Sequence, residues 1–217
     1  MSGLLVKDFR LLLQRKQAVI MMLVIAVFIS FSIGEEFILG YLTFIGLILA
    51  TSSISYDEFD NGYPFLMTLP ITNKTYVLEK YVLSAGAMLF SWLVALVISF
   101  ATKMMHGAPI QPAEDLLGAV LILFFPCLLM NIMIPIQLKF GSEKSRIVLL
   151  AIGGIGAIIG YGAAGFMEKI GDDIDDIIQT LDRITPATAF LLLTVLVIAT
   201  LFISYRISNV IMDRKIL

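Results

Sequence analysis

Residues 18–30 read AVIMMLVIAVFIS, a stretch that carries no charge and would be apolar on every side of a helix. It belongs to the first of six uncharged apolar runs, at about residues 17–33, 37–55, 81–102, 116–138, 147–167 and 187–205. Crossing about 30 Å of hydrocarbon takes roughly 20 helical residues, so each run is long enough for about one span. A transmembrane barrel would need short segments that alternate in polarity, and these runs do not alternate. The sequence therefore predicts an all-α polytopic membrane protein with six transmembrane helices.

Composition supports this prediction and limits the size of the loops. Of the 217 residues 59% are hydrophobic and 15% are charged, and the mean hydropathy is +0.96. Six spans leave room only for short loops, so we expect one transmembrane domain over residues 1–217. The net charge of -2 argues against a nucleic-acid binder. The single cysteine, Cys127, rules out an internal disulfide framework and a multi-cysteine metal site.

The distribution of Lys and Arg predicts the orientation. Basic residues concentrate on the cytoplasmic side of membrane proteins, and here twelve of the 15 fall on one side of the predicted spans. They are Lys7, Arg10, Arg15, Lys16, Lys74, Lys80, Lys139, Lys144, Arg146, Arg206, Arg214 and Lys215. The other side holds Lys103, Lys169 and Arg183. Both termini are therefore expected in the cytoplasm.

Several kinds of chemistry are missing from the sequence. None of the six runs contains an ionisable Asp, Glu, Lys, Arg or His, although proton-coupled carriers need such groups at membrane depth. The only histidine, His106, falls in a predicted outer loop, and there is no H-E-x-x-H motif for zinc. A phosphate-binding G-x-x-x-x-G-K-[ST] loop is also absent. We therefore expect no catalytic residues, metal or cofactor in this chain.

Two of the runs contain residues with more than one interpretation. In the fourth run, Pro126 and Pro135 flank Asn131, which indicates a bent helix on a substrate path or, alternatively, static kinks with Asn131 bonded to another helix. In the fifth run, Gly156-x-x-x-Gly160 has the spacing that lets helix backbones pack closely.

Two amphipathic helices are expected outside the spans. Residues 4–16 place Leu5, Phe9 and Leu12 on one stripe, which predicts a helix in the inner membrane interface or a basic anchor for the first span. Residues 168–183 combine a regular apolar stripe with an acidic face. We expect this second helix to be an outer lid or a solvated surface. Calcium binding is not expected, because the glycine and glutamate of a calcium loop are missing at their required positions.

The loop between the second and third runs, residues 56–80, is the most informative segment. Asn61-Gly62 is a turn signal, Pro64 suits the start of a helix and Pro70 its end. A helix of about two turns cannot stand alone in water. Its apolar side chains, which include Phe65, Leu66 and Leu69, should therefore dock on a membrane or a protein partner.

In this loop the sequence resembles the permeases of ABC-2 type exporters. The residues that carry the resemblance are Tyr56-Asp57-Glu58, Asn61-Gly62, Leu69-Pro70-Ile71, Lys74-Thr75-Tyr76-Val77 and Lys80-Tyr81. Within that family the chain looks most similar to the small bacterial six-span group that includes the phenol-soluble modulin exporter permeases. Asp60 lengthens the stretch between Glu58 and Asn61 relative to the usual pattern.

The resemblance implies a non-catalytic subunit in the bacterial plasma membrane. Two permease copies would form the path for an amphipathic, hydrophobic or peptide substrate, and two cytosolic ATPases would supply ATP and Mg. The coupling element would comprise Asp57, Glu58, Asp60, Asn61, Gly62, Tyr63, Phe65, Leu66, Leu69, Pro70 and Lys80. Phe65, Leu66 and Leu69 would fill a groove of the ATPase. Asp57, Glu58 and Asp60 would meet basic residues at its rim, and Lys80 and Tyr81 would join the loop to the third span.

Two other functions stay open on the residues alone. One is an uncoupled channel or an ion-coupled carrier that uses backbone carbonyls. The other is a membrane enzyme, or an assembly or immunity factor, that transports nothing.

Overall fold

The computed structural model describes residues 2–14, 16–32, 35–58, 62–68, 70–107, 109, 111–167 and 186–215. The helices are α1 (Ser2–Gln14), α2 (Lys16–Ser32), α3 (Glu35–Glu58), α4 (Gly62–Met67), α5 (Asn73–His106), α6 (Pro112–Met167) and α8 (Pro186–Lys215). These residues include no β-strand, so the described chain is all-helical. The predicted acidic helix at residues 168–183 lies outside the described residues.

Four helices are long and apolar enough to cross a membrane. They are Phe37–Glu58, Asn73–His106, Pro112–Gly141 and Ala187–Lys215. A fifth crossing is counted if Gly3–Gln14 and Val19–Phe28, which meet at 62°, form one bent span. Of the two other predicted spans, residues 17–33 and 147–167, the first lies in α2 as far as Ser32 and the second lies in the second part of α6. Four or five candidate spans are thus observed, and six crossings remain a prediction.

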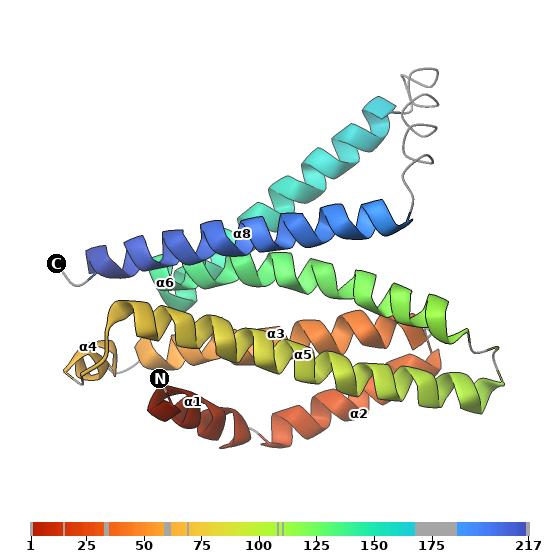
Figure 1. The fold of residues 1–217 in the computed structure, drawn as a ribbon, viewed down its shortest axis with the longest axis horizontal. Coiled ribbons are helices and arrows are strands. Elements are labelled where there is room, and N and C mark those ends of the chain that lie inside the picture. Colours follow the sequence, from red (N-terminus) through yellow and green to blue (C-terminus); the bar gives the residue numbers. More distant parts are fainter. Residues whose placement is uncertain are drawn as a thin grey trace.

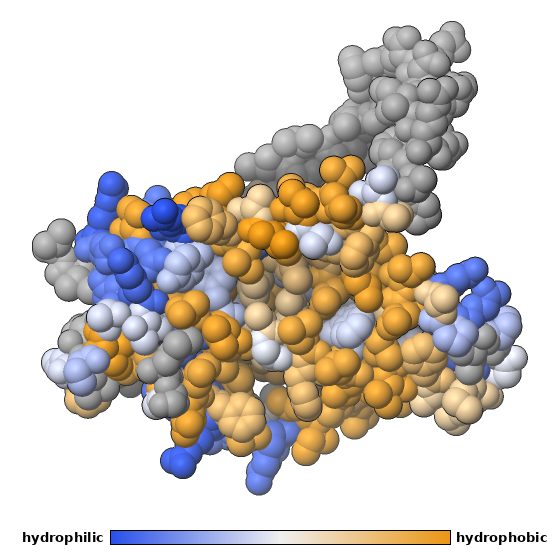
Figure 2. Space-filling view, viewed as in Figure 1, coloured by the Kyte–Doolittle hydropathy of each residue, from blue (hydrophilic) through white to orange (hydrophobic). Residues whose placement is uncertain are grey.

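The two ends of the bundle differ from its middle. Both termini lie at the end that also carries α4 (Figure 1). Hydrophobic residues cover the middle of the visible face, and hydrophilic residues gather at the two ends (Figure 2). This distribution fits a bilayer, because the apolar middle of the helix bundle would face lipid and its hydrophilic ends would face water.

Local chemistry explains where α5 begins and ends. The Thr72 hydroxyl accepts a hydrogen bond from the Thr75 N–H at 3.3 Å, which caps the first turn. At the other end Gly107 adopts φ 65°, a left-handed conformation that suits glycine, and its N–H bonds to the Met104 carbonyl at 3.3 Å. Across this turn, the Lys103 ammonium lies 2.7 Å from the Asp115 carboxylate and ties the end of α5 to the start of α6.

Helix α3 lies at the centre of the bundle and packs against α5, α6 and α2. Its approach to α5 is close because Gly46 faces Ser91, where an added Cβ would come within 2.6 Å of the Ser91 Cβ. Buried residues form two clusters, one near α4 around Tyr76 and Ile134, and one toward the other end around Ile38 and Ala95.

Helix α6 is interrupted at Gly141, whose φ of 76° and ψ of 176° are not helical. The break separates the candidate span Pro112–Gly141 from the later helical residues. It falls at the same end of the bundle as α4, because Leu138 and Glu58 both contact Lys215. The predicted loop between the fourth and fifth spans is thus a sharp backbone turn inside one helical element.

Candidate functional site

The short helix α4 lies between α3 and α5 and is the observed part of the predicted coupling element. It spans six residues, Gly62–Met67, and ends where Thr68 bonds to the Phe65 carbonyl through its N–H at 3.1 Å and its hydroxyl at 2.7 Å. The first two residues of the predicted coupling element, Asp57 and Glu58, belong to α3 and not to α4.

Not every predicted residue of this element is described. Asp60, Asn61 and Leu69 lie outside the described residues, as does the side chain of Tyr63. Gly62 packs closely on the end of α3, since an added Cβ would lie 3.1 Å from the Asp57 carbonyl oxygen. Pro70 follows α4 as an exposed residue.

Phe65 and Leu66 are adjacent in the chain but differ in exposure. The Phe65 side chain is 68% exposed, whereas Leu66 is 8% exposed. Leu66 belongs to the buried cluster that also contains Leu4, Tyr76 and Met212. The expectation that both side chains enter a partner's groove is therefore corrected for Leu66, which anchors α4 to its own bundle.

Beneath α4 lies a buried ionic cluster that joins three helices. Lys80 of α5 contacts Asp8 of α1, and its ammonium lies 2.6 Å from a carboxylate oxygen of Asp57 at the end of α3. The same ammonium donates to the Ser53 hydroxyl at 3.2 Å. Lys7 completes the cluster through a contact with Asp57 and a 3.1 Å ion pair with Asp8.

The burial of this cluster makes its charges dependent on one another. Lys80 and Asp8 are 1% and 0% exposed, and Asp57 is 5% exposed. A buried charge without a partner costs several kcal/mol, so each of these groups needs the others. The Tyr76 hydroxyl adds a hydrogen bond of 3.0 Å to Asp57, and the Lys80 ammonium lies 5.1 Å from the centre of the Tyr76 ring.

Asp57 therefore does not lie where the sequence interpretation expected it. Instead of pointing outward toward a partner's basic residues, it forms ion pairs with Lys7 and Lys80 and accepts a hydrogen bond from the Tyr76 hydroxyl inside the chain. The physical reason is that a carboxylate at the end of α3 faces two helices that each supply a lysine. Lys80, which was expected only to join the loop to the third span, also holds α1, α3 and α5 together through its contacts with Asp8 and Asp57.

A third carboxylate, Glu79, lies beside the cluster. Its side chain is 0% exposed, and one oxygen lies 3.5 Å from the Lys80 ammonium. Within the described part of the chain, neither Glu79 oxygen has a hydrogen-bond partner. Three buried carboxylates thus share two ammonium groups, of which Lys80 is buried and Lys7 is 31% exposed.

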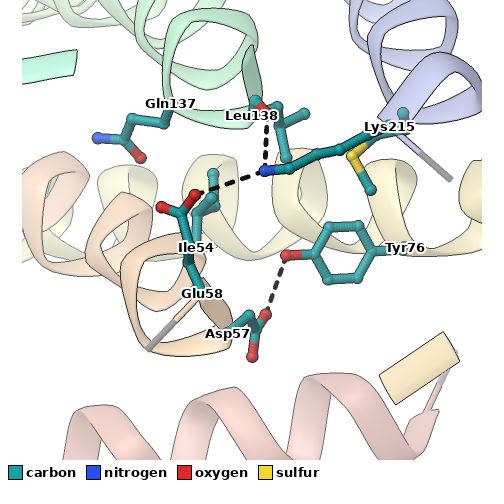
Figure 3. Close-up of a pocket in the computed structure, with 8 residues that line it drawn as sticks. Ile54, Asp57, Glu58, Tyr76, Gln137, Leu138 and Lys215 are labelled. Atoms are coloured by element: carbon teal, nitrogen blue, oxygen red, sulfur yellow. Dashed lines mark hydrogen bonds and ion pairs between the residues drawn. The ribbon is translucent and has the colours of Figure 1, made fainter. Parts of the chain in front are cut away.

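Glu58, next to Asp57, lies on the other side of α3 and contacts the C-terminal end of α8. The Lys215 ammonium lies 3.5 Å from a Glu58 oxygen and 3.3 Å from the Leu138 carbonyl (Figure 3). An added Cβ at Gly141 would lie 2.5 Å from both Glu58 carboxylate oxygens, so the break in α6 makes room for this side chain. The Glu58 side chain stays 40% exposed and remains accessible to a partner.

The comparison with known families gives one match. The family described as ABC-2 family transporter protein matches residues 3–213. The chain belongs to the ABC-2 transporter family. No curated protein and no solved structure matches it. Membership makes the chain a transport component of the membrane that works with an ABC ATPase, as the resemblance in the loop at residues 56–81 implied.

In this ABC-2 family protein, Pro135 of α6 lies one helical turn after Asn131, which forms hydrogen bonds to α8. Pro135 has no N–H, so the Asn131 carbonyl loses its partner within the helix. The Ser204 hydroxyl of α8 donates to that carbonyl, and the Asn131 side-chain nitrogen donates to the Thr200 hydroxyl at 3.1 Å. Of the two interpretations of Asn131, the structure contains the bond to another helix. A place on the substrate path remains a prediction for Asn131, Pro126 and Pro135.

Tyr81 links this region to the ionic cluster. Its hydroxyl lies 2.6 Å from the Ser204 hydroxyl and 3.0 Å from that of Ser208. Because Tyr81 follows Lys80 directly, adjacent residues of α5 bind the cluster on one side and α8 on the other. The predicted packing residues Gly156 and Gly160 lie in the second part of α6, where the structure does not describe their surroundings.

Sequence reasoning missed Asp8, the acid that Lys80 binds. A signal was present, because Asp8 is the only acidic residue before Glu35 and lies among basic and apolar residues. The predicted membrane-facing stripe of α1, through Leu5, Phe9 and Leu12, stays a prediction. Leu4 and Asp8 are buried in the structure, and Phe9 is 58% exposed.

Proposed function

We propose that this chain is the permease subunit of an ATP-driven exporter and that a cytosolic ATPase docks on α4 around Phe65. The observation that carries the proposal is the two-sided nature of α4. Phe65 is 68% exposed while the adjacent Leu66 is fixed in the bundle. An exposed aromatic side chain on a firmly anchored helix is the arrangement expected of an interface anchor.

The contacts behind α4 suggest how force would reach the membrane. A push on α4 acts on the end of α3 and the start of α5, which share the cluster of Asp57, Lys80 and Asp8. From Lys80 the next residue, Tyr81, contacts α8. The proposed movement is therefore a concerted displacement of α1, α3, α5 and α8 rather than a bend of one loop.

Further features of the proposal come from the sequence. The chain would act as two copies with two ATPases, in a bacterial plasma membrane, with both termini in the cytoplasm. ATP and Mg would bind the ATPase. The cargo would be amphipathic or hydrophobic, and a peptide if the similarity to the phenol-soluble modulin exporter permeases extends to function. The path would include Pro126, Asn131 and Pro135.

The test is assembly with the ABC ATPase of the same transporter, purified from the native membrane. Phe65→Asp places a charge in the interface, so we expect at least a tenfold loss of affinity for the ATPase with an unchanged unfolding temperature. Phe65→Leu keeps an apolar side chain and should retain most of the binding. Met105→Asp changes a side chain that is 72% exposed at the opposite end of α5 and serves as the matched control.

Three results would contradict the proposal. If Phe65→Asp assembles with the ATPase as the unchanged chain does, α4 is not the docking element. If the purified chain moves solutes across vesicles without ATP, it is an uncoupled channel or a carrier. Absence of any associated ATPase together with an activity on lipid or peptide would favour a membrane enzyme.

A further inference from the structure

A groove runs along the surface between α6 and α8, apart from the cluster beneath α4. Its volume is about 440 Å³, within the range of about 300–1,000 Å³ that is usual for sites of small molecules. The walls carry two stripes of apolar side chains, each at a spacing of four residues. They are Ile132, Ile136 and Phe140 on α6, and Ile203, Ile207 and Ile211 on α8.

The uncharged polar residues of the walls, Asn131, Thr200 and Ser204, bond to one another. The Ser204 hydroxyl donates to the Asn131 carbonyl, and Thr200 accepts from the Asn131 side chain while donating to the Val197 carbonyl at 3.0 Å. The remaining Asn131 side-chain oxygen is buried away from the surface. The groove therefore offers hydrocarbon to an occupant along most of its length.

One end of the groove carries a charge. Lys139 lies at the end nearest α4, since its neighbour Leu138 contacts Lys215. Its side chain is exposed, and its ammonium lies 5.0 Å from the centre of the Phe140 ring. Among the side chains that the structure describes, to which that of Glu143 does not belong, no carboxylate forms an ion pair with Lys139. This end therefore favours an anionic group.

The length of the groove fits one leaflet of a membrane. From Ile132 to Phe140 the helix rises about 12 Å, close to half of a hydrocarbon core that is about 30 Å thick. Lys139 would then lie at headgroup level. A zwitterionic lipid would bring its own ammonium toward Lys139, whereas an anionic lipid would not.

We propose that this groove binds an anionic phospholipid of the cytoplasmic leaflet, with one acyl chain between the isoleucine stripes and the phosphate beside Lys139. The inference rests on the groove and on the predicted orientation, and it does not require an ATPase. The bound chain packs where Pro135 weakens α6 and where Ser204 holds it to α8. Lipid occupancy therefore stabilises the contact between these two helices.

The experiment uses the full chain in mild detergent, titrated with dioleoyl phosphatidylglycerol or dioleoyl phosphatidylcholine. Bound lipid is counted by native mass spectrometry, and the unfolding temperature is measured in parallel. We expect about fivefold tighter binding of phosphatidylglycerol, since one lysine near an anionic lipid contributes about 1 kcal/mol. Lys139→Gln should abolish this preference without lowering the unfolding temperature of the lipid-free chain.

Two further variants keep the result specific to the groove. Lys74→Gln removes an exposed lysine at the same end of the molecule but outside the groove, and should keep the preference. Ile207→Trp fills the groove and should weaken the binding of both lipids. Equal binding of the two lipids by the unchanged chain, or the same loss in Lys74→Gln as in Lys139→Gln, would overturn the proposal.

The same experiment distinguishes a phospholipid from two other occupants of the groove, a free fatty acid and a second copy of the chain. Oleate, added as a third probe, would compete as well as phosphatidylglycerol if the site takes free fatty acids, and the phospholipid assignment would then be wrong. If Ile207→Trp instead dissociates a dimer and leaves lipid binding unchanged, the groove is covered by a second copy of the chain.

Discussion

Asp57 and Glu58 are adjacent acids at the end of α3, yet they have different surroundings. Asp57 is 5% exposed and contacts Lys7 and Lys80. The Glu58 side chain is 40% exposed and lies 3.5 Å from Lys215, which is itself partly exposed. Exposed ion pairs contribute up to about 1 kcal/mol, whereas the loss of one partner from a buried pair costs much more. The two acids therefore have different consequences for stability although the sequence presents them as a pair.

A first prediction concerns Lys80. Lys80→Met leaves Asp8 and Asp57 buried with only Lys7 for compensation, and should destabilise the protein by about 3 kcal/mol or more. The measurement is thermal unfolding in detergent. Lys74→Met, at an exposed position on the same helix, should have little effect.

The double variant Asp8→Leu with Lys80→Met separates charge from packing. Because it removes a buried carboxylate along with the ammonium, it should lose less stability than Lys80→Met alone. Asp8→Leu is measured alone as well, and a double variant that loses the sum of the two single losses would show that the Asp8–Lys80 contact has no energetic coupling.

At the scale of elements, α6 depends on α8 to complete its backbone hydrogen bonds. Pro135 removes the bond that the Asn131 carbonyl would make within the helix, and Ser204 replaces it from the neighbouring helix. In lipid no water is present to satisfy such a carbonyl. The proline thus makes two helices interdependent instead of merely bending one.

A second prediction follows from this bond. Ser204→Ala should destabilise the chain by about 1–3 kcal/mol, because a buried carbonyl is left without a donor. In a Pro135→Ala background, position 135 regains a backbone N–H that can bond to the Asn131 carbonyl. Ser204→Ala should therefore destabilise that background clearly less than it destabilises the unchanged chain. Unfolding temperatures of the four proteins of this double-mutant cycle provide the measurement.

Thr194→Ala is the matched control on α8. Its hydroxyl donates at 2.8 Å to the Phe190 carbonyl within the same helix at an exposed position. The loss of that bond should change stability little. If Ser204→Ala costs the same with and without Pro135, the proline and the serine are not coupled.

At the scale of the whole molecule, both termini, α4 and the ionic cluster gather at one end (Figure 1). The opposite end carries the turn after α5 and the Lys103–Asp115 ion pair. A transporter driven from the cytosol needs its docking element and its mechanical joint on the same side. The distribution of Lys and Arg predicts that this side is the cytoplasm.

A third prediction tests that orientation. In a Cys127→Ser background, which removes the single native cysteine, one cysteine is introduced at exposed Thr68 or at exposed Gln111. A membrane-impermeant maleimide should label Gln111→Cys in intact cells, and Thr68→Cys only after the membrane is permeabilised. The reverse pattern would place α4 outside the cell and exclude docking of a cytosolic ATPase.

The position of most helices could be predicted from the sequence, because their formation is largely local. A run such as residues 37–55 is apolar throughout and must satisfy its backbone bonds within itself in lipid. The Thr72 cap can be recognised from the sequence for the same reason, since the cap and the N–H that it satisfies are three residues apart. The bounds of the coupling helix were less predictable, because α3 continues through Glu58 by packing on its neighbours.

The sequence by itself determined that this is a helical membrane protein, and it predicted that the apolar loop around residue 65 docks on a membrane or a partner, since solvent preference is a property of each segment. Only the tertiary structure decided which side chains of that loop are exposed on the surface. It buries Leu66, exposes Phe65 and turns Asp57 inward. These outcomes depend on contacts such as that between Asp8 and Lys80, which are 72 positions apart. Such contacts follow from how whole helices pack, and no local pattern encodes them.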